Sequence, residues 1–445
     1  MTAQGGGPPR TALVGGTVID VRRGTTIPDA AVLVESGRIS TVGPRAQVPV
    51  DGARTIDTKG AWLIPGLMDM HVHVSGEGRS DLLPLYVAHG VTTVRDVGGS
   101  LTVLRLLRDD LETGRLVGPR LFYAGPLLDG IPPLWPPMTM LVDTEARAES
   151  AVRFLATHEV SVVKVYNSVS EASLAVVIRT AHELGLPVTG HVPRAVRTSR
   201  AVEMGMDGLE HIRVTGREIL PAAEADKIDY LPLRRREPLL WERYDPTSAQ
   251  CAELAERFAR SRLFLDPTLV VDASVSFPED TSTNPAELPA WIAEMLTQSQ
   301  RPPEIRAVPE DLRELGSSGF AKRLQFIGVC ARAGVRLIAG TDLTGVGEQL
   351  PGRGLQRELA YFVDAGLSPL QALQAATITP AEALGKEREL GAIEPGFHAD
   401  LVILDADPLA DIRNLRRVRA VMQRGTLATP AELLREPQSK AGGSR

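Results

Sequence analysis

Two histidines one residue apart end an apolar run near the start of the chain. The run is Leu63–Met70, and the pair is His71 and His73. If the run is a strand, both imidazoles point to the same face, because side chains alternate along a strand. Two imidazoles on one side of a strand end can bind one metal ion. The pair alone is equally compatible with two structural histidines at a strand terminus.

Four further side chains with nitrogen or oxygen ligand atoms lie in or at the end of other apolar runs: Lys164, His191, His211 and Asp342. A single histidine at a strand end is more often a satisfied polar residue, and Asp342 after Gly-Thr could cap a turn. Lys164 is harder to explain in this way, because an unpaired ammonium inside an apolar strand costs several kcal/mol. We therefore expect Lys164 to be neutral, paired or modified.

The other four histidines do not fit the same pattern. Three lie on or at the end of predicted helices and one lies in the C-terminal β region: His89, His158, His182 and His398. We interpret them as structural. The only cysteines, Cys251 and Cys330, are far apart and lack CxxC spacing, so neither a disulfide framework nor a thiolate zinc site is indicated. A metal in this protein is expected to have nitrogen and oxygen ligands.

The elements that must position these residues differ between the ends and the middle of the chain. Short alternating runs separated by turns fill Thr11–Ile56, and similar runs return in Ala399–Leu404 and Val418–Met422. This spacing is typical of small antiparallel β units. We infer that the two ends pair into one β-sandwich-like domain beside the central segment.

The middle of the chain alternates apolar strands with amphipathic helices. Counting from Leu63–Met70 gives eight strands with helical crossovers, the pattern of a (β/α)8 TIM barrel in the α/β class. The other seven predicted strands are Gly90–Val97, Arg120–Ala124, Val160–Tyr166, Pro187–His191, Gly208–Ile212, Leu263–Val271 and Arg336–Asp342. A doubly wound open sheet is the alternative, but no GxGxxG motif opens any of these helices. The carboxyl ends of barrel strands form the catalytic face, so the six candidate ligands converge on one mouth.

The predicted domain order follows from these patterns. Residues 1–62 and 386–430 form the two parts of the β-sandwich, 63–385 form the barrel, and 431–445 form a disordered tail. A long polar stretch, Ser276–Ser318, is expected to be a functional lid or a mobile loop. Trp135 and its neighbouring prolines follow the third strand, on the catalytic side of the barrel. Trp135 is compatible with two roles there, as part of a pocket wall or in plain loop packing.

The ordered motifs resemble those of the amidohydrolase superfamily over nearly the whole chain. The closest likeness is to its prolidase-like and imidazolonepropionase-like metal hydrolases, in the branch with a carboxylated lysine on strand 4. The motifs that carry the resemblance are Pro65–His73, Gly90–Asp96, Lys164–Tyr166, Gly190–Pro193, Glu210-His211, Gly340–Asp342, Ala375–Pro380 and Pro395–Leu401.

The resemblance implies a site for one or two divalent ions, with Zn²⁺ as the first candidate. The implied ligands are His71, His73 and Asp342 for the more buried ion, His191 and His211 for the second ion, and a carboxylated Lys164 as the bridge. Carboxylation converts the problematic ammonium into an anionic oxygen ligand, which also removes the objection to its burial.

The resemblance also implies a reaction. Hydroxide activated by the metal attacks a carbonyl, and the metal and the Tyr166 hydroxyl stabilise the oxyanion. Asp342 passes the proton of the water to the leaving nitrogen. Alternation puts Tyr166 on the face shared with Lys164, although simple core packing is also compatible with its position.

The predicted activity is hydrolysis of an amide or peptide bond in a peptide or N-acyl amino acid. A narrower version is a peptidase in peptide natural-product maturation that removes a follower peptide, as in bottromycin-like pathways. The alternative is a cyclic-amide hydrolase, like imidazolonepropionase, or a lactone hydrolase. A deaminase is disfavoured, because Val192-Pro193 and no His-Ala-Gly-Glu-like general acid follow His191. A noncatalytic scaffold is disfavoured because all six ligand positions are filled.

Composition narrows the partners and the compartment. Apolar residues make up 43% and charged residues 23% of 445, which is close to the globular average. The net charge of -6 provides no global basic field for nucleic acid or an anionic membrane. The chain has neither an apolar signal region nor a run of about 18 apolar residues. We expect a cytoplasmic enzyme with a small-molecule or peptide substrate, for which a homo-oligomer stays open.

Overall fold

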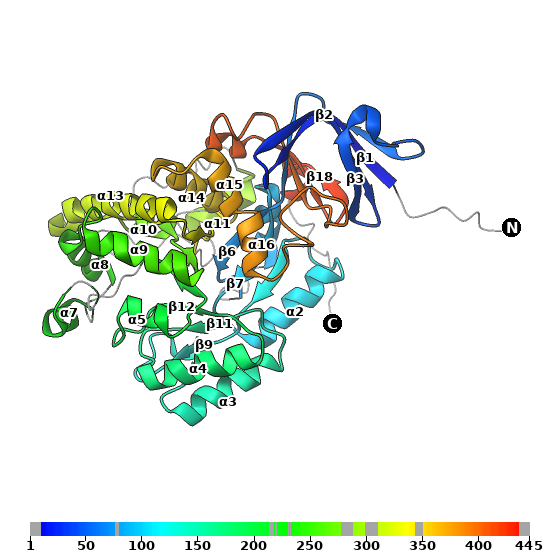
Figure 1. Ribbon diagram of the computed structural model, residues 1–445. Helices are drawn as coiled ribbons and strands as arrows, with labels where there is room; N and C mark the ends of the chain where they lie inside the picture. Colours follow the sequence, from blue (N-terminus) through cyan, green and yellow to red (C-terminus); the bar gives the residue numbers. More distant parts are fainter. Residues whose placement is uncertain are drawn as a thin grey trace.

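The first five and the last three strands of the chain form one mixed sheet beside the barrel (Figure 1). The computed structural model describes residues 10–75, 80–212, 218, 220–229, 231, 233–276, 288–298, 310–342 and 350–435. The sheet order is β18-β17-β16-β5-β1-β2-β3, and β4 pairs with β1. Its strands are β1 (Arg10–Asp20), β2 (Thr25–Glu35), β3 (Arg38–Pro44), β4 (Arg54–Asp57), β5 (Trp62–Pro65), β16 (Leu401–Leu404), β17 (Val418–Gln423) and β18 (Thr426–Ala428).

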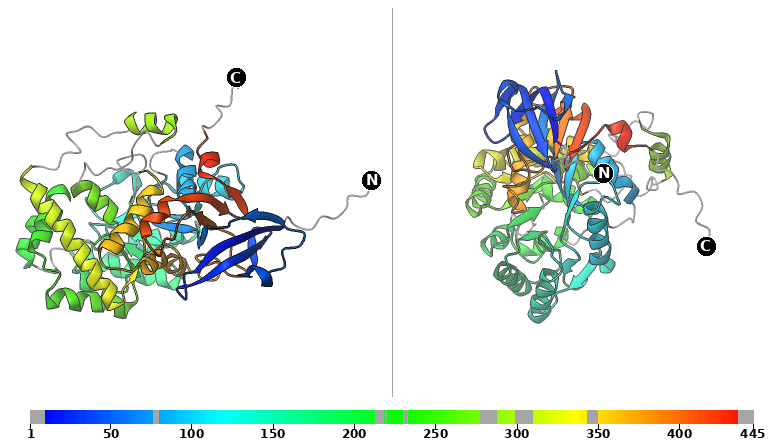
Figure 2. Two further views of the ribbon diagram at one scale, coloured as in Figure 1. Left: turned by 90° about the horizontal axis from the view of Figure 1, so that it is seen from above. Right: turned by 90° about the vertical axis from the view of Figure 1, so that its right-hand side faces the viewer.

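The two ends of the chain meet at β5, as predicted. This strand runs parallel to β1 and antiparallel to β16, with Leu401 opposite Pro65. The N-terminal and C-terminal strands accordingly lie side by side in both views of Figure 2. Because β5 hydrogen-bonds to both groups, the strands of the two ends form a single sheet. Alternating residues of β1 serve different cores, with Ala12 on one side and Leu13 on the other.

The chain leaves this sheet at Gly66. Leu63–Pro65 belong to β5, so the first barrel strand is β6 (Leu67–Val72) and the crossing lies after the predicted boundary at residue 63. The Gly66 N–H donates to Asp400 O at 2.8 Å. A Cβ at Gly66 would lie 2.1 Å from Thr92 Oγ1, so the crossing requires glycine.

The barrel strands form three short parallel sheets. Their orders are β6-β7-β8, β10-β9-β11-β12 and β13-β14-β15. Isolated backbone hydrogen bonds span the junctions between sheets: Ser161 N to Tyr123 O at 2.8 Å, Asp207 N to Val188 O at 2.8 Å, and Met70 N to Ala339 O at 2.9 Å. The strands are β7 (Val91–Asp96), β8 (Arg120–Tyr123), β9 (Leu127–Asp129), β10 (Thr139–Leu141), β11 (Val163–Val165), β12 (Val188–Gly190), β13 (Gly208–Glu210), β14 (Phe264–Asp266) and β15 (Arg336–Leu337).

Helices separate these strands and lie outside them (Figure 1). Side-chain caps fix several helix starts, for example Ser170 Oγ, which accepts from Ser173 N before α4. The described helices of six or more residues are α1 (Leu83–Ala88), α2 (Leu101–Glu112), α3 (Glu145–Ala156), α4 (Glu171–Glu183), α5 (Thr198–Glu203), α7 (Ala222–Asp229), α8 (Leu233–Arg243), α9 (Ala249–Ser261), α10 (Leu269–Ser276), α11 (Ala290–Gln298), α13 (Glu310–Ala333), α14 (Arg353–Asp364), α15 (Pro369–Ala375) and α16 (Ile378–Ala383).

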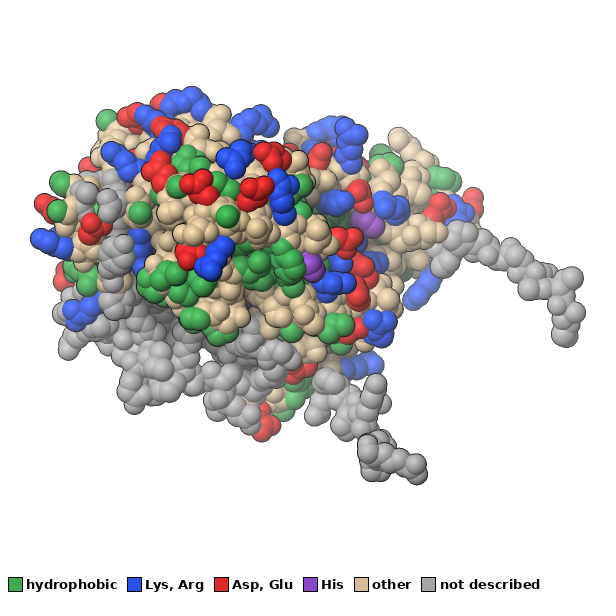
Figure 3. Space-filling model, turned by 90° about the horizontal axis from the view of Figure 1, so that it is seen from below, with side chains coloured by type: hydrophobic (Ala, Val, Ile, Leu, Met, Phe, Trp, Pro, Cys, Tyr) green, Lys and Arg blue, Asp and Glu red, His purple; other side chains and the backbone are tan. Residues whose placement is uncertain are grey.

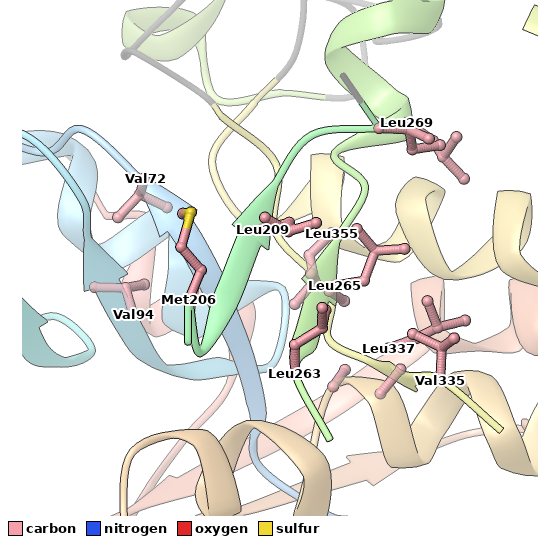
Figure 4. Close-up of a cluster of buried hydrophobic side chains, with 14 of the residues drawn as sticks. Val72, Val94, Met206, Leu209, Leu263, Leu265, Leu269, Val335, Leu337 and Leu355 are labelled. Atoms are coloured by element: carbon pink, nitrogen blue, oxygen red, sulfur yellow. The ribbon is translucent and has the colours of Figure 1, made fainter. Parts of the chain in front are cut away.

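The main hydrophobic core fills the space between the parallel strands and these helices. Figure 4 shows part of it, with Leu209 from β13, Leu265 from β14, Leu337 from β15 and Leu355 from α14. All four side chains are at most 6% exposed. Burying such a side chain stabilises the fold by about 1.5–3 kcal/mol. The strands are therefore anchored from both sides, which fixes where their carboxyl ends lie.

The structure corrects several predicted elements. The seventh strand ends at Asp266, and Leu269–Val271, predicted as strand, begin helix α10. Within the predicted loop Ser276–Ser318, α11 and the start of α13 are helical, and most of the rest lies outside the described residues. The tail prediction of 431–445 overlaps the short helix α17 (Pro430–Leu433), and residues 436–445 lie outside the described part. Strands β9 and β10 were not predicted.

Surface features agree with the composition. On the face shown in Figure 3, acidic and basic side chains are interspersed and not segregated by sign. In the ranges that the structure describes, no helix is both long and apolar enough to cross a membrane.

Candidate metal centre

The six predicted ligands come from five strands whose carboxyl ends lie together. His71 is in β6 and His73 follows it, Lys164 is in β11, and the other three follow β12, β13 and β15. Neighbouring imidazoles are close: the ring centroids are 5.4 Å apart for His71 and His73, and 4.8 Å apart for His71 and His211. The ring of His191 is 4.8 Å from that of His211. The structure therefore brings the four histidines into one cluster.

Asp342 lies among three of these imidazoles. Its Oδ1 is 3.4 Å from His71 Nε2 and 3.2 Å from His73 Nε2, and its Oδ2 is 3.8 Å from His211 Nε2. A second acid fixes this arrangement, because buried Asp69 accepts bonds from Thr341 N at 3.0 Å and Thr341 Oγ1 at 2.7 Å. Burial raises the pKa of Asp69 to about 7. These bonds hold the segment before Asp342 against β6.

In all four histidines the same ring nitrogen, Nδ1, contacts a protein oxygen atom. Each Nδ1 lies within hydrogen-bond distance of an oxygen atom, which leaves Nε2 as the ring nitrogen suited to bind a metal. The partners are Glu210 Oε2 for His71 at 2.8 Å, Gly98 O for His73 at 3.0 Å, Asn167 Oδ1 for His191 at 2.9 Å and Thr268 Oγ1 for His211 at 2.5 Å. Burial lowers the pKa of His71 to about 4, so this imidazole is neutral at pH 7, as a ligand must be.

Two candidate ligands have left-handed backbone conformations. The φ angles are 66° at His211 and 53° at Asp342. Non-glycine residues seldom adopt positive φ, and such strain clusters at functional sites. At His211 the turn also breaks strand alternation, so adjacent Glu210 and His211 both face His71, with Glu210 Oε2 2.8 Å from His71 Nδ1. Sequence periodicity alone could not have placed Glu210 in the site.

Lys164 is deeply buried in β11. Its side chain is 1% exposed, and in the described part of the chain no hydrogen bond or ion pair within 4.0 Å holds its ammonium. Burial lowers its pKa to about 8, although the carboxylates of Glu210 and Asp342 act in the opposite direction. Near pH 8 part of the amine is therefore neutral. The neutral amine is the form that reacts with carbon dioxide.

The carboxylate of Glu210, to which the sequence alone assigned no role, supports His71. Glu210 accepts from Arg95 NH2 at 2.7 Å and from Thr189 Oγ1 at 2.6 Å, besides its contact with His71. Burial acts against ionisation, but the Arg95 guanidinium, followed by Lys164 and His71, holds the pKa of Glu210 well below its usual range. Arg95 Nε also donates to Met70 O at 2.7 Å. Glu210 is thus a fixed anion that sets the tautomer of His71.

Asp266, at the end of β14, is a second buried acid beside His71. Its Oδ2 lies 4.0 Å from His71 Nδ1, and within the described residues neither carboxylate oxygen has a hydrogen-bond partner. Burial, followed by the charge of Glu210, raises its pKa well above the usual range. A Cβ at Gly340 would lie 2.2 Å from Asp266 Oδ2, so glycine is needed there. Of these two acids, Asp266 therefore retains its proton to a higher pH than Glu210.

This assignment predicts that Asp266→Asn is tolerated. A raised folded pKa means that the native state holds a proton that the unfolded state releases above about pH 3.9, so wild-type stability falls as pH rises through that window. Asparagine does not titrate. At pH 7 the metal-free variant should be at least as stable as wild type, with the difference shrinking toward pH 4. Thermal unfolding of both proteins across pH 4–8 measures this, and a variant destabilised at pH 7 would show that Asp266 is ionised.

Tyr166 lies beside this cluster. Its ring stacks on His191 with centroids 4.0 Å apart and an interplanar angle of 29°. Its hydroxyl accepts a hydrogen bond from Trp135 Nε1 at 3.1 Å. The side chain is only partly buried, in contrast to those of Val163 and Val165 on β11, the strand that it follows. This position favours a place at the mouth over simple core packing.

The donor set fits a divalent metal ion. Within the described residues, two groups offer ligand atoms within 4.8 Å of one another: His71, His73 and Asp342, and His71, Glu210 and Asp266. Imidazole nitrogens with carboxylate oxygens suit zinc and similar first-row ions. The unpaired buried amine of Lys164 and the uniform Nδ1 contacts of the histidines agree with such an ion. The other four histidines bond elsewhere, for example His182 Nε2 with Asp207 Oδ2 at 2.8 Å.

Comparison with known proteins finds one matching family model and relatives that align over most of the chain. Residues 304–428 match the model of the Amidohydrolase family. Adenine deaminase of Paracoccus denitrificans is 23% identical over 439 residues, covering 97% of this chain and 60% of that protein. The chain thus spans about 60% of the length of this longer relative. Imidazolonepropionase of Pseudomonas entomophila is 24% identical over 417 residues, covering 88% of this chain and 91% of that protein.

Solved structures share the fold. A bottromycin amidohydrolase superposes with a TM-score of 0.74 at 23% identity, covering 96% of this chain and 88% of that one. A Xaa-Pro dipeptidase is among the other structures of this fold. These neighbours identify the architecture as a TIM-barrel-type fold with an additional domain. Together, the family model and the relatives support a hydrolase of the amidohydrolase superfamily.

Proposed function

We propose that the protein is a metal-dependent hydrolase that cleaves a carbon–nitrogen amide bond at the mouth of a closed (β/α)8 barrel. One observation carries the proposal: four histidines, each with Nδ1 in contact with a protein oxygen, form one cluster, and three of their Nε2 atoms lie 3.2–3.8 Å from the carboxylate of Asp342. Family membership supports the reaction class.

Six side chains would hold one or two divalent ions, with Zn²⁺ as the first candidate. They are His71, His73, Lys164, His191, His211 and Asp342. A bound divalent ion of this kind lowers the pKa of water toward neutrality and polarises a carbonyl. Lys164 would take part as a carbamate: its ammonium first loses one proton, and the neutral amine then adds to carbon dioxide with loss of a second proton, so that an anion replaces the buried cation. Arg95, whose NH2 bonds Glu210, provides positive charge nearby.

Two side chains would act on the substrate directly. The Asp342 carboxylate accepts the proton of the attacking water and delivers it to the leaving nitrogen. The Tyr166 hydroxyl, aligned by its stacking on His191, donates to the oxygen that becomes negative as the carbonyl is attacked. Glu210 keeps His71 in the tautomer with a proton on Nδ1.

The proposed substrate is a peptide or an N-acyl amino acid. The neighbouring bottromycin amidohydrolase and Xaa-Pro dipeptidase support this class by name. Removal of a follower peptide in natural-product maturation is the narrower version of the proposal. A cyclic amide is the second candidate, because the imidazolonepropionase relative matches over nearly its full length.

Removal of the metal tests the proposal. Purified protein should contain one or two equivalents of a divalent ion per chain by elemental analysis. A chelator in excess should abolish hydrolysis of a dipeptide and N-acyl amino acid panel and lower the thermal midpoint, because an ion that binds only the folded state stabilises it by mass action. Readdition of Zn²⁺ should restore both. A protein without bound ions, whose stability and activity are indifferent to the chelator, would refute the metal-dependent mechanism.

A further inference from the structure

Seven consecutive apolar residues follow strand β9 and line the surface. The sequence of residues 131–137, here called the apolar rim, is Ile-Pro-Pro-Leu-Trp-Pro-Pro. Its large side chains face solvent: Ile131 is 64%, Trp135 50% and Leu134 46% exposed. A run of this length on a soluble protein surface is normally selected against unless it binds something. The six proposed metal ligands do not explain why the apolar rim is exposed.

Backbone hydrogen bonds hold the apolar rim in one conformation. The buried carboxylate of Asp129 accepts from three backbone N–H groups, at 2.9 Å from Gly130, 2.6 Å from Ser168 and 3.1 Å from Leu134. Ser168 Oγ donates to Pro132 O at 2.9 Å. A Cβ at Gly130 would lie 1.9 Å from Ser168 O, so glycine is needed for this close approach. The rim is fixed to the segment that follows Tyr166, and its exposed side chains are presented in a preorganised form.

The apolar rim reaches the candidate metal centre through two contacts. Trp135 Nε1 donates to the Tyr166 hydroxyl at 3.1 Å, and the Tyr166 ring stacks on His191 at 4.0 Å. A side chain lying on the rim would thus be beside the group proposed to stabilise the oxyanion. Leu106, which is 61% exposed, lies on helix α2 and does not have this connection.

We propose that the apolar rim is the substrate subsite for an aromatic or branched aliphatic side chain next to the scissile amide, and that Trp135 is the positioning residue for Tyr166. This inference rests on the proposed amide hydrolysis. A rigid indole with prolines on both sides loses little conformational entropy on binding and presents a large apolar surface. Differences of a few methylene groups in such subsites change specificity by about 10-fold to 200-fold.

Four dipeptides test the subsite, because they place the variable side chain on either side of the bond: Phe-Ala, Ala-Phe, Ser-Ala and Ala-Ser. In metal-loaded wild type, at least one phenylalanine peptide should have a kcat/KM about 10-fold above that of its serine counterpart. Ile131→Ser and Leu134→Ser should reduce this ratio mainly through KM of the phenylalanine peptide. Leu106→Ser removes an equally exposed apolar side chain on α2 and should leave the ratio unchanged.

Substitutions of Trp135 separate its two roles. Trp135→Phe keeps an aromatic surface but has no N–H for Tyr166, so it should lower kcat while retaining the preference for phenylalanine. Trp135→Ala should lower kcat and also lose the preference. The emission of Trp135, taken as wild type minus Trp135→Phe, should shift to shorter wavelength when N-acetyl-phenylalanine amide binds, a readout that requires no turnover.

The outcomes distinguish a failure of the proposed subsite from a failure of the proposed amide hydrolysis. If no dipeptide is hydrolysed by the metal-loaded protein but the emission of Trp135 responds to the amide, amide hydrolysis fails while the subsite stands. If phenylalanine and serine peptides are hydrolysed equally, the subsite is refuted and the hydrolase stands. If Ile131→Ser and Trp135→Ala instead dissociate an oligomer in size-exclusion chromatography, the rim is an interface between copies and the subsite is refuted.

Discussion

Replacing Asp342 by asparagine is expected to lower kcat about 10³-fold while most of the bound metal is retained. An amide oxygen can still act as a ligand, but it cannot accept a proton from water, and a positioned general base contributes about 10²-fold to 10⁴-fold. Asparagine is also the substitution that the backbone tolerates best, because Asp342 has a φ of 53° and asparagine is enriched in this region. The loss can then be assigned to chemistry and not to strain.

Metal content by elemental analysis and kcat on the same preparation measure this effect. Asp364→Asn provides the matched control, since Asp364 forms a half-exposed ion pair with Arg413 at 3.0 Å on the surface and should change neither quantity. Activity retained in Asp342→Asn would contradict the proton-transfer role. Loss of the metal together with activity would show that Asp342 acts mainly as a ligand.

The alternation of strands and helices could be predicted because, within most elements, apolar residues recur at one period, either that of a strand or that of a helix. The second barrel strand, for example, was predicted at Gly90–Val97 and is observed as β7 at Val91–Asp96. The errors arose where two signals overlap. The segment Leu263–Val271 is apolar at both ends and is interrupted only by Asp266-Pro267-Thr268. A strand end and a helix start were therefore predicted as one strand. That reading concealed Asp266, although an acid ending an apolar run also marked Asp342.

Among the site residues, those with strand-end positions could be predicted and their supporting partners could not. His191 was found from its position after β12, but the contact of its Nδ1 with Asn167 depends on the loop after β11. The Glu210 side chain was assigned no role, because its contact with His71 spans 139 positions in the chain. Tertiary hydrogen bonds of this kind have no local period, so only the fold shows them.

The buried charges around Glu210 determine a second large effect. The Arg95 guanidinium is only 4% exposed, and it donates to Met70 O and to Glu210 Oε1. Asp266 is the less suitable counter-ion, because burial raises its pKa well above the usual range. Glu210 is thus the anion that balances Arg95 and also orients His71. Its removal should affect stability and metal binding together.

Glu210→Gln is expected to destabilise the protein by about 3–5 kcal/mol, because it leaves a buried cation without its partner. The glutamine amide also presents N–H groups where Arg95, Thr189 and His71 all donate to the carboxylate. Loss of the acceptor for His71 Nδ1 should weaken divalent-ion binding by about 10-fold to 100-fold. Chemical denaturation of the metal-free protein and competition with a chromophoric chelator measure the two effects separately.

Glu358→Gln is the matched control, because Glu358 is as buried as Glu210 but its pKa is shifted in the opposite direction. Its two oxygens accept from Leu269 N at 2.8 Å and Val270 N at 2.7 Å, and burial raises its pKa well above the usual range. The substitution removes no charge and should cost only about 1–2 kcal/mol, through one mismatched backbone donor, with metal affinity unchanged. Equal losses of stability in the two variants would show that Glu210 is not the counter-ion of Arg95. Unchanged metal affinity in Glu210→Gln would show that the orientation of His71 does not depend on this carboxylate.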